Sequence, residues 1–196
     1  SYALSFLSTS QGNLTLPDDP VFDTSSNFTF EFWFRPTTST QDFIELVTKQ
    51  SIFDIDFWFN DTIYVFFSSY GSVASSIGFN RGSWNHLAIT HEVGSPNVVS
   101  LYINGQLAGV IQSTGTPQDN NNDFIFNRQE TIFDLDYIAY WSETLTPAQI
   151  NTRYASGAGK QLVGNEVDLK GLWELNDGSG TIANEKTGLA QDGEIT

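Results

Sequence analysis

The sequence predicts an all-β fold, a two-sheet antiparallel jelly-roll sandwich with one short helix near the C-terminus. Short segments rich in aromatic and β-branched residues, with alternating polarity, recur along most of the chain and are bounded by Gly, Pro, Asn or Ser. Only one segment has a helical pattern. The sequence does not alternate strands with helices, as a parallel sheet would require. These observations together favour two packed antiparallel sheets.

The expected strands number about a dozen. They are Tyr2–Leu7, Asn13–Leu16, Phe28–Arg35, Phe43–Lys49, Ile52–Phe59, Thr62–Ser68, Val73–Phe79, Trp84–His91, Val98–Ile103, Gln106–Ile111, Phe124–Asn127 and Thr131–Trp141. The clearest turn is Asn104-Gly105, because this pair supplies the positive φ angles of a type I′ hairpin. We therefore expect the strands on either side of it to pair.

The one helical segment runs from Leu145 to Tyr154. Thr146 can cap its N-terminus and Pro147 can take its first position. We assign residues 1–168 to the sandwich. Residues 169–196 are either the final strands of the same sandwich or the start of a tandem repeat.

Composition limits the classes of function. Acidic residues outnumber basic ones by 23 to 8, and the formal net charge of −15 disfavours nucleic acid and anionic membranes as partners. The chain has no cysteine, which excludes disulfides, thiolate metal sites and a cysteine nucleophile. No apolar run is long enough to span a membrane. We expect an extracellular or cell-surface protein, bacterial in origin.

Four segments, in order, resemble one known family. Phe28–Pro36 is similar to an early strand of laminin-G-like, concanavalin A-like lectin/glucanase domains, and Trp84–Thr90 followed by Leu101–Gln106 is similar to their central hairpin. Asp136–Trp141 followed by Leu145–Ile150 resembles the late strand and helix, and Leu172–Gly180 resembles a further segment of such domains. The resemblance implies a jelly-roll binding module, often assisted by calcium.

Three aspartates are the candidate calcium ligands. The resemblance implies Asp136, which matches an acidic residue at the start of the family's late strand. Asp119 and Asp123 belong to the segment 118–123, which is dense in the oxygen donors that calcium takes. An ordinary solvated turn is the favoured explanation of the same segment.

Strand parity indicates a set of outward-facing residues. If Phe28, Phe30, Phe32 and Phe34 face the core, Glu31 and Trp33 face away from it. The same parity places three residues of the next long strand outward, Asp54, Asp56 and Trp58, provided that Phe53, Ile55, Phe57 and Phe59 are core. Tyr102 is outward in the strand before the Asn104-Gly105 turn.

If these strands share a sheet, the outward residues form one polar and aromatic groove. Aromatic rings stack on the C–H faces of sugars, and carboxylates accept hydrogen bonds from hydroxyl groups. The alternative is that Trp33 and Trp58 pack under loops. The candidate ligand-binding residues are Glu31, Trp33, Asp54, Asp56, Trp58 and Tyr102.

The sequence therefore predicts a non-catalytic carbohydrate-binding or adhesion module of a larger secreted or cell-surface protein, with a glycan or a surface protein as partner. A protein-interaction or spacer repeat is the first alternative. A glycoside hydrolase or lyase is the second, because outward carboxylates suit glycosidic chemistry. No catalytic motif supports it, because the Glu-x-Asp-x-x-Glu strand that is typical of hydrolases in the family that the chain resembles is missing. A serine or histidine mechanism is not supported either, since the chain has two histidines and no nucleophile elbow. The sequence does not predict an oligomeric state.

Overall fold

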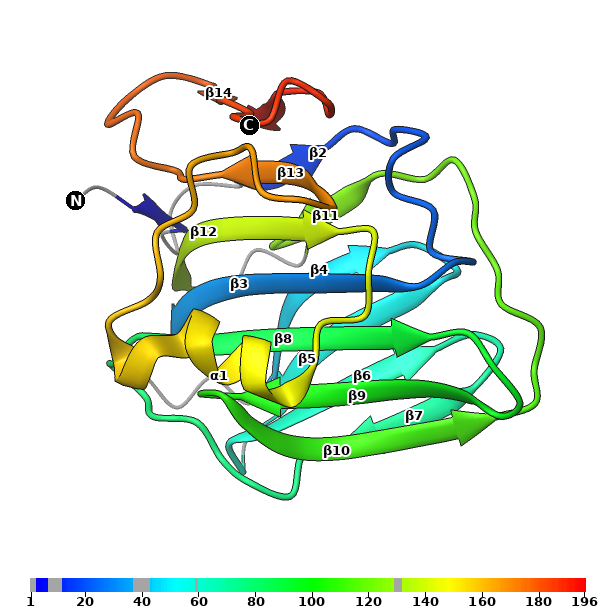
Figure 1. Cartoon of the computed structure of the whole chain (residues 1–196). Helices are drawn as coiled ribbons and strands as arrows, with labels where there is room; N and C mark the ends of the chain where they lie inside the picture. The colour runs from blue at the N-terminus through cyan, green and yellow to red at the C-terminus, as the bar shows by residue number, and fades with distance from the viewer. Residues whose placement is uncertain (1–2, 7–11, 37–42, 59, 129–131) are drawn as a thin grey trace.

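Two antiparallel sheets pack face to face, and one short helix lies on the outer side of one of them (Figure 1). This computed structural model describes residues 3–6, 12–36, 43–58, 60–128 and 132–196. The expected all-β sandwich with one helix near the C-terminus is confirmed. Parts of the predicted strands at Tyr2, Leu7, Phe59 and Thr131 lie outside the described residues. No helix in these ranges is long and apolar enough to cross a membrane.

The first sheet, sheet A, has the strand order β1-β12-β3-β8-β9-β10, with β13 also paired to β12. Its strands are β1 (Leu4–Ser5), β12 (Phe133–Trp141), β3 (Phe28–Pro36), β8 (Asn85–Glu92), β9 (Asn97–Ile103), β10 (Gln106–Ser113) and β13 (Leu169–Trp173). The predicted hairpin is confirmed, because Gln106 pairs with Ile103 and the turn residues Asn104 and Gly105 have φ of 51° and 76°.

The second sheet, sheet B, has the order β14-β15-β2-β11-β4-β5-β6-β7. Its strands are β14 (Ile182–Ala183), β15 (Gly193–Ile195), β2 (Leu14–Leu16), β11 (Phe124–Phe126), β4 (Phe43–Lys49), β5 (Phe53–Trp58), β6 (Thr62–Phe67) and β7 (Gly71–Ala74). The C-terminal segment therefore adds strands to both sheets, β13 to sheet A and β14 and β15 to sheet B.

The core between the sheets is rich in aromatic residues. The four inward phenylalanines of β3 are at most 1% exposed, as strand parity predicts. Phe53, Ile55 and Phe57 of β5 meet them from sheet B and are equally buried. Period-two alternation thus places the apolar side of each strand between the sheets, and burial of these large side chains is the main driving force for folding.

The helix α1 (Pro147–Tyr154) has the predicted start. Thr146 is the N-cap, and its side chain and that of Gln149 form a reciprocal capping box. Eight residues are too few for a helix that is stable by itself in water, so α1 depends on packing against the sheet. Ile150, which is fully buried, provides the apolar contact.

The outer face of sheet A beneath α1 is a second, smaller core, and this differs from the open groove that parity alone suggests. Its buried residues come from the sheet, from α1 and from the segments on either side of the helix: Ala88, Tyr102, Ala139, Trp141, Leu145, Ile150, Leu162, Leu169 and Leu172. Helix and loop cover these positions, so being outward on the strand does not make them exposed.

Glu31 is the polar centre of this covered face. Its Oε1 accepts hydrogen bonds from Arg153 Nε at 2.8 Å and Trp141 Nε1 at 3.1 Å, and its Oε2 lies 3.0 Å from His86 Nε2. Glu31 and His86 are each 1% exposed, and Arg153 is 7% exposed. One carboxylate therefore joins β3, β8, β12 and α1.

Arg153 extends this network to the segment that follows the helix. Its Nη1 donates to the carbonyl oxygen of Lys160 at 2.8 Å, and its own carbonyl oxygen accepts from Lys160 N at 2.9 Å. Burial alone would raise the pKa of Glu31, but the hydrogen bond from His86 and the charge of Arg153 outweigh burial and lower it to about 2.

Replacing Glu31→Gln is expected to destabilise the fold by about 3–5 kcal/mol, because Arg153 is left as a buried charge without its carboxylate. Urea unfolding measures this loss. The double variant Glu31→Gln/Arg153→Met is the matched control and should be more stable than the sum of the single changes predicts, since it leaves no buried charge. If the loss of stability in the double variant equals the sum of the two single losses, Glu31 and Arg153 do not interact as described.

The pH dependence of unfolding tests the same group. Because folding lowers the pKa of Glu31 from 4.5 to about 2, its contribution is complete above pH 4.5 and is lost as the pH falls towards 2. The wild-type protein should therefore lose more stability over this range than the Glu31→Gln variant. Parallel curves for the two proteins would show that Glu31 does not hold its charge in the fold.

Candidate functional site

The predicted ligand-binding residues lie on two opposite faces of the sandwich. Glu31 and Trp33 lie on β3 of sheet A, whereas Asp54, Asp56 and Trp58 lie on β5 of sheet B. Both sets point away from the shared core, as parity predicts. The expectation that they form one groove is wrong, because it required β3 and β5 to belong to the same sheet.

Two of the predicted residues are buried within the protein. Glu31 is enclosed by its hydrogen-bond partners beneath α1. Tyr102 is 4% exposed and packs in the second core. Both side chains support the covered face of sheet A.

The set on sheet B combines carboxylates with aromatic rings. Asp54 accepts a hydrogen bond from the Thr48 hydroxyl, and Trp58, 41% exposed, has ring contacts with Phe43 and Tyr64 at 5.5 and 5.6 Å. Asp56 Oδ1 is buried without a hydrogen-bond partner. Burial, with the charges of Asp54 and Glu45, raises the pKa of Asp56 to about 7. Ligand binding by this face stays a prediction.

The acidic loop is held by a buried lysine. Lys49 is fully buried, and its Nζ donates to Asp18 Oδ1 and to the carbonyl oxygen of Asn122, both at 2.7 Å. Asp119 lies 3.9 Å from the same ammonium and accepts a hydrogen bond from Thr24 Oγ1 at 2.8 Å. Asp123 Oδ1 accepts from Asp18 N. The ammonium group of Lys49 thus already faces oxygens of Asp18, Asp119 and Asn122.

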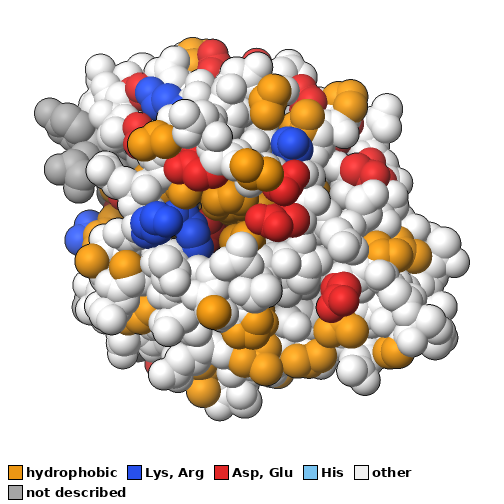
Figure 2. All heavy atoms as spheres, viewed as in Figure 1, with side chains coloured by type: hydrophobic (Ala, Val, Ile, Leu, Met, Phe, Trp, Pro, Cys, Tyr) orange, Lys and Arg blue, Asp and Glu red, His pale blue; other side chains and the backbone are white. Residues whose placement is uncertain are grey.

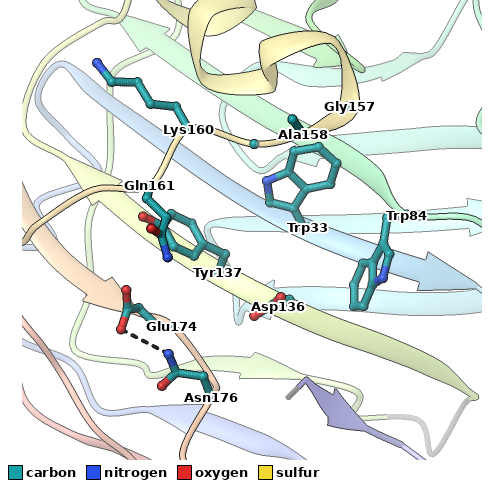
Figure 3. Close-up of a pocket in the computed structure, with 11 residues that line it drawn as sticks. Trp33, Trp84, Asp136, Tyr137, Gly157, Ala158, Lys160, Gln161, Glu174 and Asn176 are labelled. Carbon is teal, nitrogen blue, oxygen red and sulfur yellow. Dashed lines mark hydrogen bonds between the residues drawn. The ribbon is translucent and has the colours of Figure 1, made fainter. Parts of the chain in front are cut away.

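A cavity of about 280 Å³ on the outer side of sheet A brings aromatic and acidic side chains together. We call it the tryptophan cavity. Its lining residues come from β3, β12, the segment before β8, the segment after α1 and the segment after β13: Trp33, Trp84, Asp136, Tyr137, Lys160, Gln161, Glu174 and Asn176, with Gly157, Ala158 and Gly159. Figure 3 shows both indole rings on one side, Glu174 and Asn176 on the other, and Asp136 between them.

A β-bulge in β12 places two successive side chains at this cavity. Asp136 is opposite Trp33 and Ala139 is opposite Glu31, so β12 contains one residue more than β3 between these pairs. Tyr137 has φ of 53°, an uncommon conformation for a residue with a side chain. Leu135 and Ile138 on either side are both fully buried, so Asp136 and Tyr137 share the outer face.

The segment after α1 forms a second wall. Tyr154, at the end of the helix, stacks on Trp33 with 5.9 Å between ring centroids and 22° between ring planes. Gly159 has φ of 67°, and a Cβ atom there would lie 3.3 Å from Trp33 Cζ2. The glycine therefore lets the backbone approach the indole ring closely. The hydrogen bond of the Tyr137 hydroxyl with Leu162 N fixes the other end of this wall.

The Asp136 carboxyl is partly buried beside a second carboxylate, Glu174. Burial, and then the charge of Glu174, raise the pKa of Asp136 to about 6, although a backbone hydrogen bond from Tyr137 acts in the opposite direction. Asn176 Nδ2 donates to Glu174 Oε2 at 3.3 Å (Figure 3). Asp136 is therefore mostly ionised at neutral pH, and this ionisation lowers the stability of the folded state.

The three predicted calcium ligands lie in two different places. Asp136 lies in the tryptophan cavity on sheet A, whereas Asp119 and Asp123 lie in the loop that Lys49 holds. The described residues contain no group of three or more acidic or histidine side chains suited to a metal ion. The side chains of the tryptophan cavity offer two carboxylates and two amides, at most six oxygens, which is the lower end of the about six to eight that calcium takes. No third carboxylate joins Asp136 and Glu174 among the described residues, and the calcium site stays a prediction.

A neighbouring hollow beside α1 has a different lining. Figure 2 shows that basic and acidic side chains gather around hydrophobic ones on the face that carries the helix. The hollow is lined by both kinds of charge, Arg153 and Lys160 with Glu143 and Glu166, around Trp141 and Leu162. The acidic and basic side chains balance in this hollow, whereas the tryptophan cavity has two acidic side chains and one basic one. We take the tryptophan cavity as the candidate site.

Sequence reasoning identified Trp33 and Asp136 but not Trp84, Tyr137, Glu174 or Asn176. One signal was available, because the buried residues of β12 shift phase between Leu135 and Ile138, a spacing of three in place of two. Such a shift indicates a bulge. Glu174 had no local signal, since it meets Asp136 only through the pairing of β13 with β12.

Comparisons with solved structures show the same fold. A candidate carbohydrate-binding protein from Bacteroides ovatus aligns over 99% of this chain with a TM-score of 0.78 and 15% identity. The binding domain of Paraclostridial Mosquitocidal Protein 1 aligns over 79% with a TM-score of 0.62 and 19% identity. The binding domain of botulinum neurotoxin DC in complex with SialylT aligns over 74% with a TM-score of 0.59 and 14% identity.

The chain spans only part of each of these structures, 57%, 43% and 39% of their lengths in the same order. None of the curated proteins matches this sequence. Residues 8–151, nearly three quarters of the chain, match the family model described as the concanavalin A-like lectin/glucanases superfamily. The chain therefore belongs to the concanavalin A-like lectin/glucanase superfamily.

Proposed function

We propose that this protein is a non-catalytic carbohydrate-binding module and that the tryptophan cavity is its sugar site. The observation that carries the proposal is the meeting of two partly exposed tryptophans, Trp33 and Trp84, with the carboxylates of Asp136 and Glu174 in one cavity. The indole rings suit the C–H face of a sugar ring, and the carboxylates and the Asn176 amide suit its hydroxyl groups.

Two further observations support a sugar ligand. The cavity volume of about 280 Å³ is close to the lower end of the roughly 300–1,000 Å³ of ligand pockets, so it suits a short stretch of glycan or a chain end. Similar structures include a candidate carbohydrate-binding protein and a toxin binding domain in complex with SialylT. We also propose that the module works within a larger secreted or cell-surface protein of bacterial origin.

A glycoside hydrolase is the second candidate, and one observation favours it. Asp136 has a raised pKa of about 6 and lies beside a second carboxylate, Glu174, as in enzymes that pair a general acid with a nucleophile or base. Release of reducing sugar ends by the wild-type protein, lost in Asp136→Asn and Glu174→Gln, would establish this candidate and overturn the non-catalytic proposal.

The Trp84→Ala variant is expected to lose about tenfold or more in affinity for a glycan found on an array, because the indole ring is the main apolar contact for the sugar. Isothermal titration calorimetry measures the loss, and the melting temperature checks that the variant folds. Trp33→Ala, on β3, is a second test of the same cavity.

Trp58→Ala is the matched control, since it removes an exposed tryptophan from sheet B. Binding that survives both sheet A variants but is lost in Trp58→Ala would move the sugar site to the Asp54, Asp56 and Trp58 face. Absence of glycan binding, with binding of a surface protein in its place, would favour the protein-interaction alternative.

Asp136→Asn is expected to raise the stability at neutral pH by about 1–2 kcal/mol, a value reduced for partial solvent screening. The reason is that folding raises the pKa of this carboxyl from 3.8 to about 6. Its ionisation therefore lowers the free energy of unfolding, and this loss is complete above about pH 6. Urea unfolding at pH 7 measures the gain. The gain should vanish below pH 3.8, where the carboxyl is protonated in both states. A destabilised variant at neutral pH would contradict the assignment.

A further inference from the structure

The carboxylates of the tryptophan cavity have no cationic partner among the described residues. Neither Asp136 nor Glu174 forms a salt bridge there. Lys160 lines the cavity, but Figure 3 shows its side chain extending away from both carboxylates. The cavity therefore holds negative charge that this part of the chain does not neutralise.

The nearby arginines are engaged elsewhere. Arg35 forms a salt bridge of 2.6 Å with Asp134, and its guanidinium lies 5.1 Å from the centre of the Trp84 ring. Arg153 forms its salt bridge with Glu31 beneath α1. Neither guanidinium can turn to Asp136 without breaking its own salt bridge.

The walls of the cavity also favour a cation. The face of an aromatic ring attracts positive charge, most strongly in tryptophan, and the cavity has two tryptophans and Tyr137. The Arg35 guanidinium already lies over the Trp84 ring at a distance typical of a cation–π contact. The formal net charge of −15 adds a long-range field that draws cationic ligands.

We propose that the tryptophan cavity selects a sugar that carries a free, protonated amino group over neutral, N-acetylated or acidic sugars. The ammonium group would lie between Asp136 and Glu174, while the ring of the same sugar stacks on an indole. This inference rests on the proposed function, because it names the class of sugar that the proposed site takes.

The test compares two probes of equal length, a glucosamine oligomer and an N-acetylglucosamine oligomer, by isothermal titration calorimetry. The pH is set just above the value of about 6 at which Asp136 ionises. The wild-type protein is expected to bind the amino oligomer about tenfold more tightly, which corresponds to about 1.4 kcal/mol. The preference should shrink as salt is added, because salt screens charge.

Three variants assign the preference to the cavity. Asp136→Asn and Glu174→Gln should each reduce the affinity ratio towards one, while the amide still hydrogen-bonds the hydroxyl groups of both probes. Glu194→Gln is the matched control, since it removes one exposed negative charge from β15 on sheet B and should leave the ratio unchanged. A ratio that falls equally in all three variants would show that net charge, not the cavity, sets the preference, and would overturn the inference.

The remaining outcomes separate this inference from the proposed function. Equal binding of both oligomers that Trp84→Ala weakens would overturn the amino-sugar inference and leave the sugar site intact. Binding of neither oligomer, nor of any glycan on an array, would overturn both. A further probe is lysine amide acetylated at its α-amino group, which keeps the side-chain ammonium. If it binds as tightly as the amino oligomer, the ligand is a basic peptide and the choice of a sugar is overturned.

Discussion

The buried charge of Glu31 is the interaction on which the outer half of this protein depends. A carboxylate in the middle of a strand, 1% exposed, would be costly without partners, and three donors from β8, β12 and α1 surround it. Its contact with Arg153 holds a helix too short to be stable alone. Through the hydrogen bonds between Arg153 and Lys160 it also holds the segment that forms one wall of the tryptophan cavity.

Strand β3 connects the core to the candidate site. Its inward phenylalanines fill the space between the sheets, and its outward residues each have a separate role. Thr29 Oγ1 donates to the carbonyl oxygen of Glu143 and accepts from Leu145 N, which fixes the chain just before α1. Glu31 holds the helix, and Trp33 lines the cavity. Because one rigid strand carries all of these contacts, the position of the Trp33 ring depends on the packing of the core.

The cavity concentrates features that cost the fold stability. Tyr137 has a positive φ angle, and Asp136 is ionised in a partly buried position beside Glu174. The surrounding structure maintains both features. Strand β12 pairs with β3 on one side and with β13 on the other, and these two pairings hold the bulge in place. Strained backbone and unfavourable charge in a concave, aromatic-lined place are typical of binding sites, and this gives the proposed sugar site its physical basis.

The sequence by itself determined the features that local physics controls. Alternation set the core face of β3 and β5, Asn104-Gly105 set one hairpin, and Thr146 with Pro147 set the start of α1. Parity defines a face only relative to a strand's own sheet. Which sheet a strand joins depends on pairing between distant segments, so only the tertiary structure decided that Trp33 and Trp58 lie on opposite sides. The same long-range pairing buried Glu31 under α1 and brought Glu174 beside Asp136.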